Sequence, residues 1–319
     1  MRRARRRLRS NPRLVAGLVL LAVVSSWALV ADVVSGDPFQ PSQALLAPPS
    51  WDHPLGTDGL GRDVLSRVLH GAATSLSVAG ASVLLATVIG LVTGLIAGYL
   101  GGVLDDLLLK VVELFLVIPK FLLALVAAAL FGPSMLLLVV ILAFVFWPAT
   151  ARLARAEALA LRERQFVEAA RALGARHSRI LARHVLPGVL PVVVVSASFQ
   201  AGAAVLIEAA LAFLGLGDRD VVSWGAMLSD AQAYVALAWW TSLFPGLAVA
   251  LTVFGTNLAG DGLNDALDVK AAPPAPPGHR QIHPPRRKGH RLHQGGKLPL
   301  ILSRAGVSMG GGPTGGLRH

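Results

Sequence analysis

The sequence contains no cysteine among its 319 residues. This absence excludes disulfide bonds, a thiol nucleophile and a thiolate metal site, and it leaves the redox compartment undetermined. Charged residues are also scarce, at 15%, whereas a soluble domain carries about a quarter. Hydrophobic residues instead make up 54% of the chain, and the mean hydropathy is +0.62. This balance predicts an all-α polytopic membrane protein rather than a soluble domain.

The net charge of +11 would ordinarily point to nucleic acid as a partner. Most of the basic residues, however, lie in an N-terminal run, one internal segment and the C-terminal tail, and apolar runs separate these groups. That spacing is typical of a membrane protein whose cytoplasmic segments are positively charged. We therefore expect contact with membrane lipid and none with nucleic acid.

Six apolar runs are long enough to cross a membrane as helices. They cover residues 14–31, 76–99, 107–131, 135–151, 189–214 and 238–259. The first run follows many arginines, as in a signal peptide, but its length and the runs after it favour a retained transmembrane helix. Residues 1–13 are then a basic cytoplasmic N-terminus, and 14–270 form one transmembrane domain.

Six crossings that begin inside put both termini and the connection at 152–187 in the cytoplasm. This connection carries eight arginines and three glutamates, which agrees with the orientation. Beyond residue 270 the composition changes to proline, glycine, histidine and arginine, so 271–319 are predicted to be a disordered basic tail. Its irregularly spaced histidines are more simply a solvated segment than a metal site, and we assign no metal to the chain.

The cytoplasmic connection holds the most informative pattern. Strong helix formers fill residues 154–173, Gly174 can end that helix in the left-handed conformation, and a second short helix fits 177–185. On these residues alone, two interpretations stay open. The turn is either a docking site for another protein or a solvated helix whose Glu168 pairs with neighbouring arginines.

This connection resembles the cytoplasmic EAA loop of the permeases of binding-protein-dependent ABC importers, with the pattern E-A-A, three residues, G, nine residues, I-x-L-P. The matching residues are Glu168, Ala169, Ala170, Gly174, Leu186 and Pro187. The isoleucine of the pattern is replaced by His184. The resemblance implies that residues 168–174 insert into a cleft on an ATP-binding subunit and transmit its nucleotide-driven closure to the membrane helices.

A second resemblance narrows the family. The segment HPLGTDGLGRDVLSRVLHGAATSL at 53–76, and the later ALAFLGLGD, SWGAML, LFPGLA and LAGDGLNDALD, are similar to the C-type permeases of dipeptide, oligopeptide and nickel importers. The similarity extends over about 50–269. It implies a bacterial cell membrane and three partners: a homologous second permease, ATP-binding subunits that carry ATP and magnesium, and an extracytoplasmic solute-binding protein.

Glycines of the 53–76 segment do not form a nucleotide site, because no Lys-Ser/Thr of a Walker A loop follows them. They are expected to shape turns outside the membrane. Charged residues of the same segment meet the solute-binding protein or form internal ion pairs, and the sequence does not choose between these alternatives. The residues concerned are Asp58, Arg62, Asp63 and Arg67.

Within the spans, Gly90, Gly94 and Gly98 recur every four residues and therefore line one face of a helix. Small residues at this spacing let two helices approach closely, so packing is preferred over a gating hinge. Pro119 and Pro191 are expected to mark kinks, although Pro191 also fits an early helical turn.

Ionisable residues within the spans are Glu113, Lys120 and Glu208. Glu113 and Lys120 are seven residues apart and are expected on one helix face. They line the pathway, or they snorkel or pair with a neighbouring helix. Glu208 serves either packing or gating.

The leading hypothesis is a transport subunit, half of the pathway for a peptide or a related small solute such as nickel. The chain itself holds no catalytic residues, cofactor or metal. The alternative is an autonomous secondary transporter, which would need an ion-coupling site at broken helices. A membrane enzyme would need a converging constellation of catalytic groups, and the sequence offers none.

Overall fold

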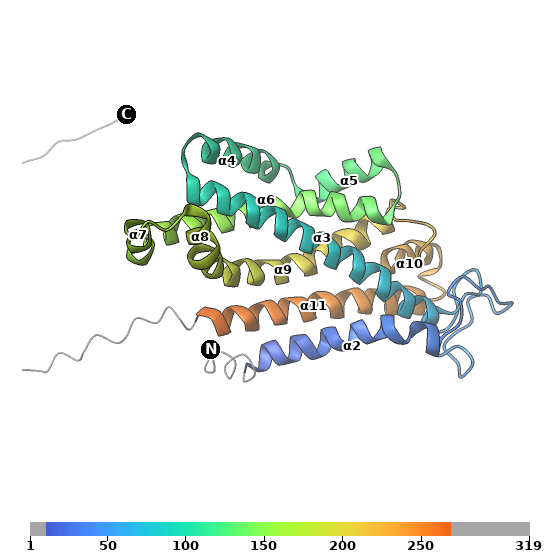
Figure 1. The fold of residues 1–319 in the computed structure, drawn as a ribbon. Helices are drawn as coiled ribbons and strands as arrows, with labels where there is room; N and C mark the ends of the chain where they lie inside the picture. Colours follow the sequence, from blue (N-terminus) through green and yellow to red (C-terminus); the bar gives the residue numbers. More distant parts are fainter. Residues whose placement is uncertain (1–10, 269–319) are drawn as a thin grey trace, which may run out of the picture. The chain divides into compact units, whose positions relative to one another are not determined.

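The structure, a computed structural model, describes residues 11–268 as helices joined by turns and loops, with one isolated β-bridge between Thr57 and Asp63 (Figure 1). The helices are α2 Pro12–Val34, α3 Val64–Leu100, α4 Gly102–Val117, α5 Lys120–Phe131, α6 Met135–Arg162, α7 Gln165–Ala172, α8 His177–Ile180, a π-helical turn Leu181–Val185, α9 Leu186–Phe213, α10 Trp224–Ala231, a 3₁₀ turn Gln232–Tyr234 and α11 Trp240–Asp268. The predicted tail at 271–319 and most of the N-terminal segment 1–13 lie outside the described residues.

Five helical segments are long and apolar enough to cross a membrane: α2, α3, α6, the continuous segment His177–Phe213 and α11. The pair α4 and α5 passes the same test jointly, which makes up to six spans. The all-α architecture with about six spans confirms the prediction from hydropathy.

The third predicted span, 107–131, is not one continuous helix. α4 and α5 are bent by 86° relative to each other, and the break lies at Ile118 and Pro119. Both residues are extended, with ψ of 128° and 125°. The reason is local, because proline forces the residue before it out of the helical region and offers no N–H for a helical hydrogen bond. The expected kink at Pro119 is therefore a full break.

Two spans also run further than hydropathy predicts. α3 begins at Val64, twelve residues before the predicted 76, because the Asp63 side chain accepts a hydrogen bond from the Ser66 N–H at 2.8 Å and caps the helix. α6 continues past the predicted 151 to Arg162. A search for apolar runs does not detect the polar ends of a helix. The predicted boundaries of these two spans were therefore wrong, although both spans are present.

The long helices run side by side and bring the connecting segments together at two ends (Figure 1). The α7 end contains the start of α2, the turn between α3 and α4, residues 163–185 and the end of α11. The α10 end contains residues 35–63, 132–134 and 214–239. Successive spans run in opposite directions, so segments far apart in the sequence lie at the same end of the bundle.

α3 and α6 share the most extensive packing of any two helices in the described chain. Gly90, Gly94 and Gly98 all face α6, and a side chain on any of them would overlap its backbone. A Cβ at Gly90 would lie 2.6 Å from the carbonyl oxygen of Trp147, and one at Gly98 would lie 2.5 Å from that of Arg155. The glycines thus allow backbone-to-backbone contact along one stripe.

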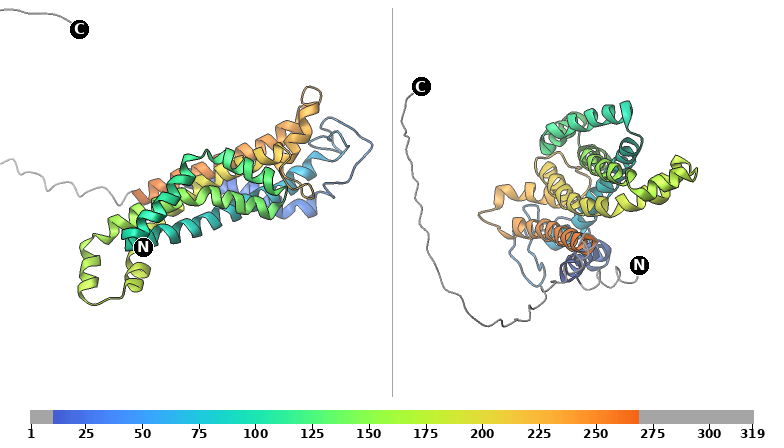
Figure 2. Two further views of the ribbon diagram at one scale, coloured as in Figure 1. Left: turned by 90° about the horizontal axis from the view of Figure 1, so that it is seen from above. Right: turned by 90° about the vertical axis from the view of Figure 1, so that its left-hand side faces the viewer.

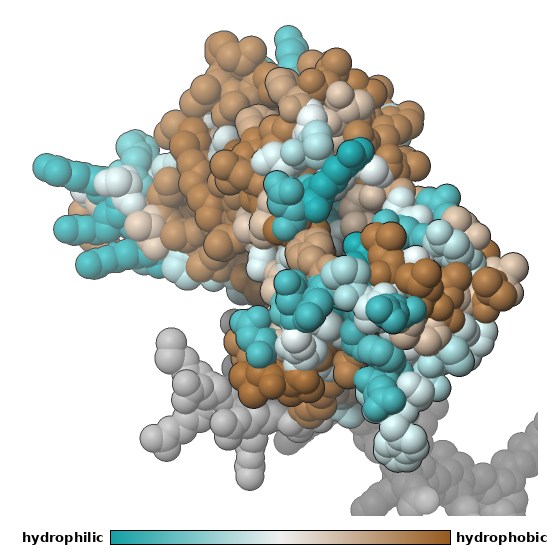
Figure 3. All heavy atoms as spheres, turned by 90° about the vertical axis from the view of Figure 1, so that its right-hand side faces the viewer, coloured by the Kyte–Doolittle hydropathy of each residue, from teal (hydrophilic) through white to brown (hydrophobic). Residues whose placement is uncertain are grey.

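α4 packs against both α3 and α6, α5 packs against α6, and the two helices expose most of their own apolar side chains. Val103, Val117 and Leu130 are examples. Figure 3, a view onto the α10 end, shows this apolar surface at the top, above a more hydrophilic region. A surface of this kind suits lipid or another membrane subunit rather than water.

Candidate functional site

Residues 163–185 leave the helix bundle at the α7 end and return to it, so that α7 and α8 project beyond the neighbouring helix ends (Figure 2). The predicted uninterrupted helix at 154–173 is wrong, because α6 stops at Arg162 and Arg164 is extended with ψ 141°. The turn brings Val167 back against the bundle, where it is fully buried. Burial of this side chain outweighs the high helix propensity of the segment.

Gly174 ends α7 as the sequence predicted. Its φ is +77°, its N–H donates to the Arg171 carbonyl at 2.9 Å, and the Ala175 N–H donates to the Ala170 carbonyl at 3.1 Å. This pair of bonds is the Schellman arrangement, in which the left-handed residue is usually glycine. The turn at residues 173–175 therefore has one defined backbone conformation.

A separate small core fixes this protruding segment to the bundle. The core joins residues from α3, α6, α7, α8, the π-helical turn and α9. Its buried members are Leu95, Tyr99, Ala154, Ala158, Val167, Ile180, Val185, Val189 and Val193. Val167, Ile180 and Val185 are each 0% exposed although they lie outside the long spans. The segment is thus packed against the ends of three spans.

The outer surface of α7 has the opposite character. Glu168 and Ala169 are exposed, Ala170 is half-buried, and the Leu173 side chain is 88% exposed. Glu168 makes no ion pair within 4.0 Å inside the described range, so the alternative in which it pairs with Arg164 and Arg171 is not realised. The motif residues Glu168 and Ala169 and the apolar Leu173 are thus accessible at the surface of the segment.

Polar contacts tie the same segment to the end of α3. The Tyr99 hydroxyl lies 3.0 Å from His177 Nδ1, and the guanidinium of Arg171 lies 5.6 Å from the centre of the Tyr99 ring. Arg162 donates to the carbonyls of Gly98 and Tyr99 at 3.4 Å. Tyr99 therefore meets both helices of the protruding segment at the point where α3 ends.

The second half of the motif continues into a span. The expected short helix at 177–185 does not stop before Pro187, because the π-helical turn leads directly into α9. Leu186 and Pro187 are the first two residues of α9. Since the helical segment is continuous from His177, Pro187 leaves one helical hydrogen bond unmade directly after the π-helical turn. His184 is exposed, and its ring lies 6.2 Å from that of Phe166. The histidine that replaces the isoleucine of the motif thus lies on the surface.

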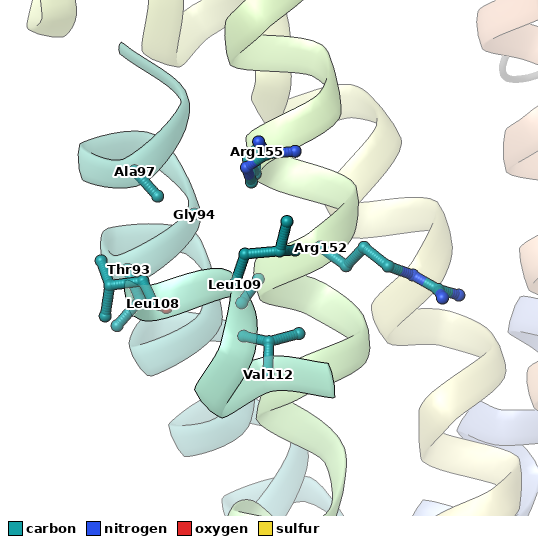
Figure 4. Close-up of a pocket in the computed structure, with 9 residues that line it drawn as sticks. Thr93, Gly94, Ala97, Leu108, Leu109, Val112, Arg152 and Arg155 are labelled. Atoms are coloured by element: carbon teal, nitrogen blue, oxygen red, sulfur yellow. The ribbon is translucent and has the colours of Figure 1, made fainter. Parts of the chain in front are cut away.

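A partly buried ion pair joins α4 to α6. Arg155 Nε donates to Asp105 at 2.5 Å and its Nη2 donates to the second oxygen at 2.7 Å. Beside this pair lies a cavity of only 10 Å³ between α3, α4 and α6, with Leu109 and Val112 facing the other two helices (Figure 4). Such a volume holds at most one water molecule, so it is a packing gap and not a substrate site.

The α10 end contains a cluster of four charges. Asp58 accepts from Arg62 at 2.7 Å and from Arg67 at 2.6 Å, and both arginines also donate to Asp230 at 2.9 Å. Asp63 is engaged separately with His53 at 2.9 Å and at the start of α3. Of the two alternatives from sequence, the structure shows internal ion pairs. They join the 35–63 segment to α3 and α10.

Replacing Arg67 with alanine is expected to destabilise the protein by about 2 kcal/mol, because Asp58 keeps its contact with Arg62 but loses a buried, charge-assisted hydrogen bond. Arg67 and Asp58 are 4% and 7% exposed as side chains. The measurement is the thermal midpoint of the purified protein in detergent. The control is Arg13→Ala, because Arg13 and Asp265 form an exposed pair at 3.4 Å whose loss should cost less than about 1 kcal/mol. Equal midpoints for the two variants would contradict a stabilising role for the cluster.

The ionisable residues of the spans occupy different environments. Glu113 is exposed on α4 and Lys120 is exposed at the first turn of α5. The expectation that they share one helix face is wrong, because the 86° bend lies between them. Glu208 is 1% exposed in α9, beside Ser75 and Ser223, and its Oε2 has no hydrogen-bond partner. Pro191 sits inside α9 without breaking it.

Comparisons with known proteins assign the family. Residues 90–272 match the family described as the binding-protein-dependent transport system inner membrane component. The chain belongs to this family. A dipeptide transport system permease protein, DppC, from Alkalihalophilus pseudofirmus is 39% identical over 84% of the chain and 90% of the relative. A putative peptide permease from Brucella suis is 40% identical over 85% of the chain and 91% of the relative.

The fold of this permease also occurs in a solved transporter. An inward-facing structure of the MetNI methionine ABC transporter matches 63% of this chain and 96% of its own chain, with a TM-score of 0.50 and 21% identity. The permease is thus the membrane subunit of an ABC importer in the bacterial inner membrane, a transport component rather than an enzyme. Family membership excludes the alternative of an autonomous secondary transporter.

Some contacts of the permease had no signal in the sequence. The bond between Tyr99 and His177 joins residues 78 positions apart, and Asp230 joins Arg67 across 163 positions. Asp105 at the start of α4 is the partner of Arg155 on α6, across 50 positions. Pairings of this separation depend on how the helices pack and not on local spacing.

Proposed function

We propose that this permease forms half of the translocation pathway of an ATP-driven peptide importer and docks its ATP-binding subunit through residues 168–174. The observation that carries the proposal is the protruding segment itself. The motif residues Glu168 and Ala169 are exposed, whereas Val167 on the other face of the same helix is fully buried. One face is thus free for a partner while the other is attached to three spans.

Movement of the ATP-binding subunit reaches the membrane helices through two connections. The small core links α7 to α3, α6 and α9, and Arg171 and His177 both contact Tyr99 at the end of α3. Because packed interiors transmit displacement rather than absorb it, a push on α7 moves these spans together. This linkage is the physical basis of the coupling.

The α7 end faces the cytoplasm in this proposal. Arginines gather there, among them Arg164, Arg176, Arg179 and Arg183, and they are exposed. Basic cytoplasmic connections are the strongest sequence determinant of orientation. The α10 end then faces the outside, where a solute-binding protein delivers the substrate. ATP and magnesium belong to the partner subunits, and this chain contributes no cofactor site.

Peptides are the proposed substrate class, since the relatives named above are described as dipeptide or peptide permeases. A second, homologous permease completes the pathway, with the exposed apolar surface of α4 and α5 covered by that subunit or by lipid.

Affinity purification of the permease from solubilised membranes of its host tests the assembly. We expect mass spectrometry to find a second permease and ATP-binding subunits, and the complex in proteoliposomes to take up tripeptides only with ATP. A well-folded permease that brings down no ATP-binding subunit would contradict the proposal.

A further inference from the structure

Lys120 lies at the break between α4 and α5, and contact with Phe146 fixes its depth. Its Nζ is 5.2 Å from the centre of the Phe146 ring. Phe146 lies eleven residues after Met135, the first residue of α6, which is about 16 Å along the helix at 1.5 Å per residue. A bilayer core is roughly 30 Å thick. With the membrane boundary placed at Met135, the cationic side chain lies close to the middle of the bilayer core.

Lys120 has no anionic partner in the part of the chain that the structure describes. No carboxylate lies within 4.0 Å of its Nζ, and the aromatic ring is the one cation–π contact it makes. The side chain is exposed, whereas Phe146 beneath it is 0% exposed. Lys120 therefore lies at the surface of the subunit, with its ammonium against a ring of α6.

An uncompensated lysine at the centre of a span is unfavourable against lipid, so such residues face water or an anion. A second permease homologous to this one would present a similar apolar face, which can carry an acid as the exposed Glu113 of α4 does here. A role of Lys120 in that contact is distinguished below by loss of the second permease from the Lys120→Gln complex. Peptides, in contrast, share one anion whatever their sequence, the terminal carboxylate.

We infer that Lys120 lines the translocation pathway and pairs with the terminal carboxylate of the peptide in transit. This inference rests on the proposed function, and it adds the substrate group that the pathway recognises. The contact is transient, because conduction requires a site weak enough to release its ligand. It gives the importer a preference for peptides with a free carboxyl terminus that is independent of the solute-binding protein.

The test compares uptake of radiolabelled trialanine and trialanine amide by the complete transporter in proteoliposomes. In Lys120→Gln the ratio of free-acid to amide uptake should fall by about fivefold relative to the wild type, the size of one partly shielded charged contact. Lys120→Arg should keep the wild-type ratio. Both genotypes use the same binding protein, so its own preference cancels in the comparison.

Lys110→Gln is the matched control, because Lys110 is also exposed but lies ten residues earlier on α4. It should leave the ratio unchanged. An equal effect of Lys110→Gln, an unchanged ratio in Lys120→Gln, or loss of both substrates together with loss of the second permease would each overturn the inference. Wild-type transporter that takes up neither peptide would show instead that the substrate class is wrong, and the inference would fail with it.

Discussion

Replacing Gly94 with leucine is expected to remove nearly all folded permease from the membrane. Gly94 faces α6, and a Cβ there would overlap the carbonyl oxygen of Ala151 and lie 2.8 Å from the Ala154 Cβ. The overlapping atom is backbone, which cannot rotate away as a side chain can. Overpacking of a core ordinarily costs about 1–3 kcal/mol, and a whole leucine against backbone lies at or above that range. The measurement is fluorescence-detected size-exclusion chromatography of solubilised membranes.

Gly80→Leu is the control for this substitution. Gly80 lies on the same helix, it is exposed, and a Cβ there would meet no atom within 4 Å. Both variants add the same hydrophobic volume to α3, and leucine has the better helix propensity in each case. A monodisperse peak for Gly80→Leu and none for Gly94→Leu would support tight packing of α3 on α6. Equal recovery of the two variants would show that the helices are not in backbone contact.

Replacing Gly174 with valine is expected to uncouple the transporter while leaving the permease in the membrane. Valine at a φ of +77° costs about 1–2 kcal/mol, equivalent to about a five- to thirtyfold loss of the docked conformation. A Cβ at this position would meet no atom within 4 Å, so the bundle itself is undisturbed. ATP-driven uptake and copurification of the ATP-binding subunit should fall together by this factor.

Gly215 provides a control with the same backbone geometry at the other end of the molecule. Its φ is +80°, and its N–H donates to the Ala212 carbonyl at 3.0 Å. The Leu216 N–H donates to the Leu211 carbonyl, also at 3.0 Å. It therefore ends α9 as Gly174 ends α7. Gly215→Val should carry the same strain but retain the ATP-binding subunit. If both variants lose that subunit equally, general destabilisation and not docking would explain the effect.

The sequence predicted the number and order of the spans because bilayer thickness imposes a length on every apolar run. It failed at Pro119, where a kink was expected and the chain turns by 86°. A proline indicates that a helix is interrupted, but the angle between the two helical segments depends on what the second segment packs against. Here α5 packs along α6 and buries Ala124 and Ala128.

The sequence identified the residues of the candidate site better than it predicted their backbone conformation. Spacing alone identified Gly174 as the end of a helix, since a left-handed turn favours that residue. The break before Gln165 was missed, because it arises from the burial of Val167 against Ile180 and neighbours from α3 and α9. No local pattern shows such contacts, which exist only once the spans are assembled.

Capture of the ATP-binding subunit by a single cysteine on α7 tests the coupling proposal most directly. The natural chain has no cysteine, so Leu173→Cys carries one reactive thiol at a side chain that is 88% exposed. Trp51→Cys is the matched control, since Trp51 is 98% exposed at the α10 end. After modification with a thiol-directed photocrosslinker in membranes that hold the complete transporter, we predict an adduct with the ATP-binding subunit for Leu173→Cys and none for Trp51→Cys. An adduct with that subunit from Trp51→Cys alone would place docking at the opposite end and contradict the proposal.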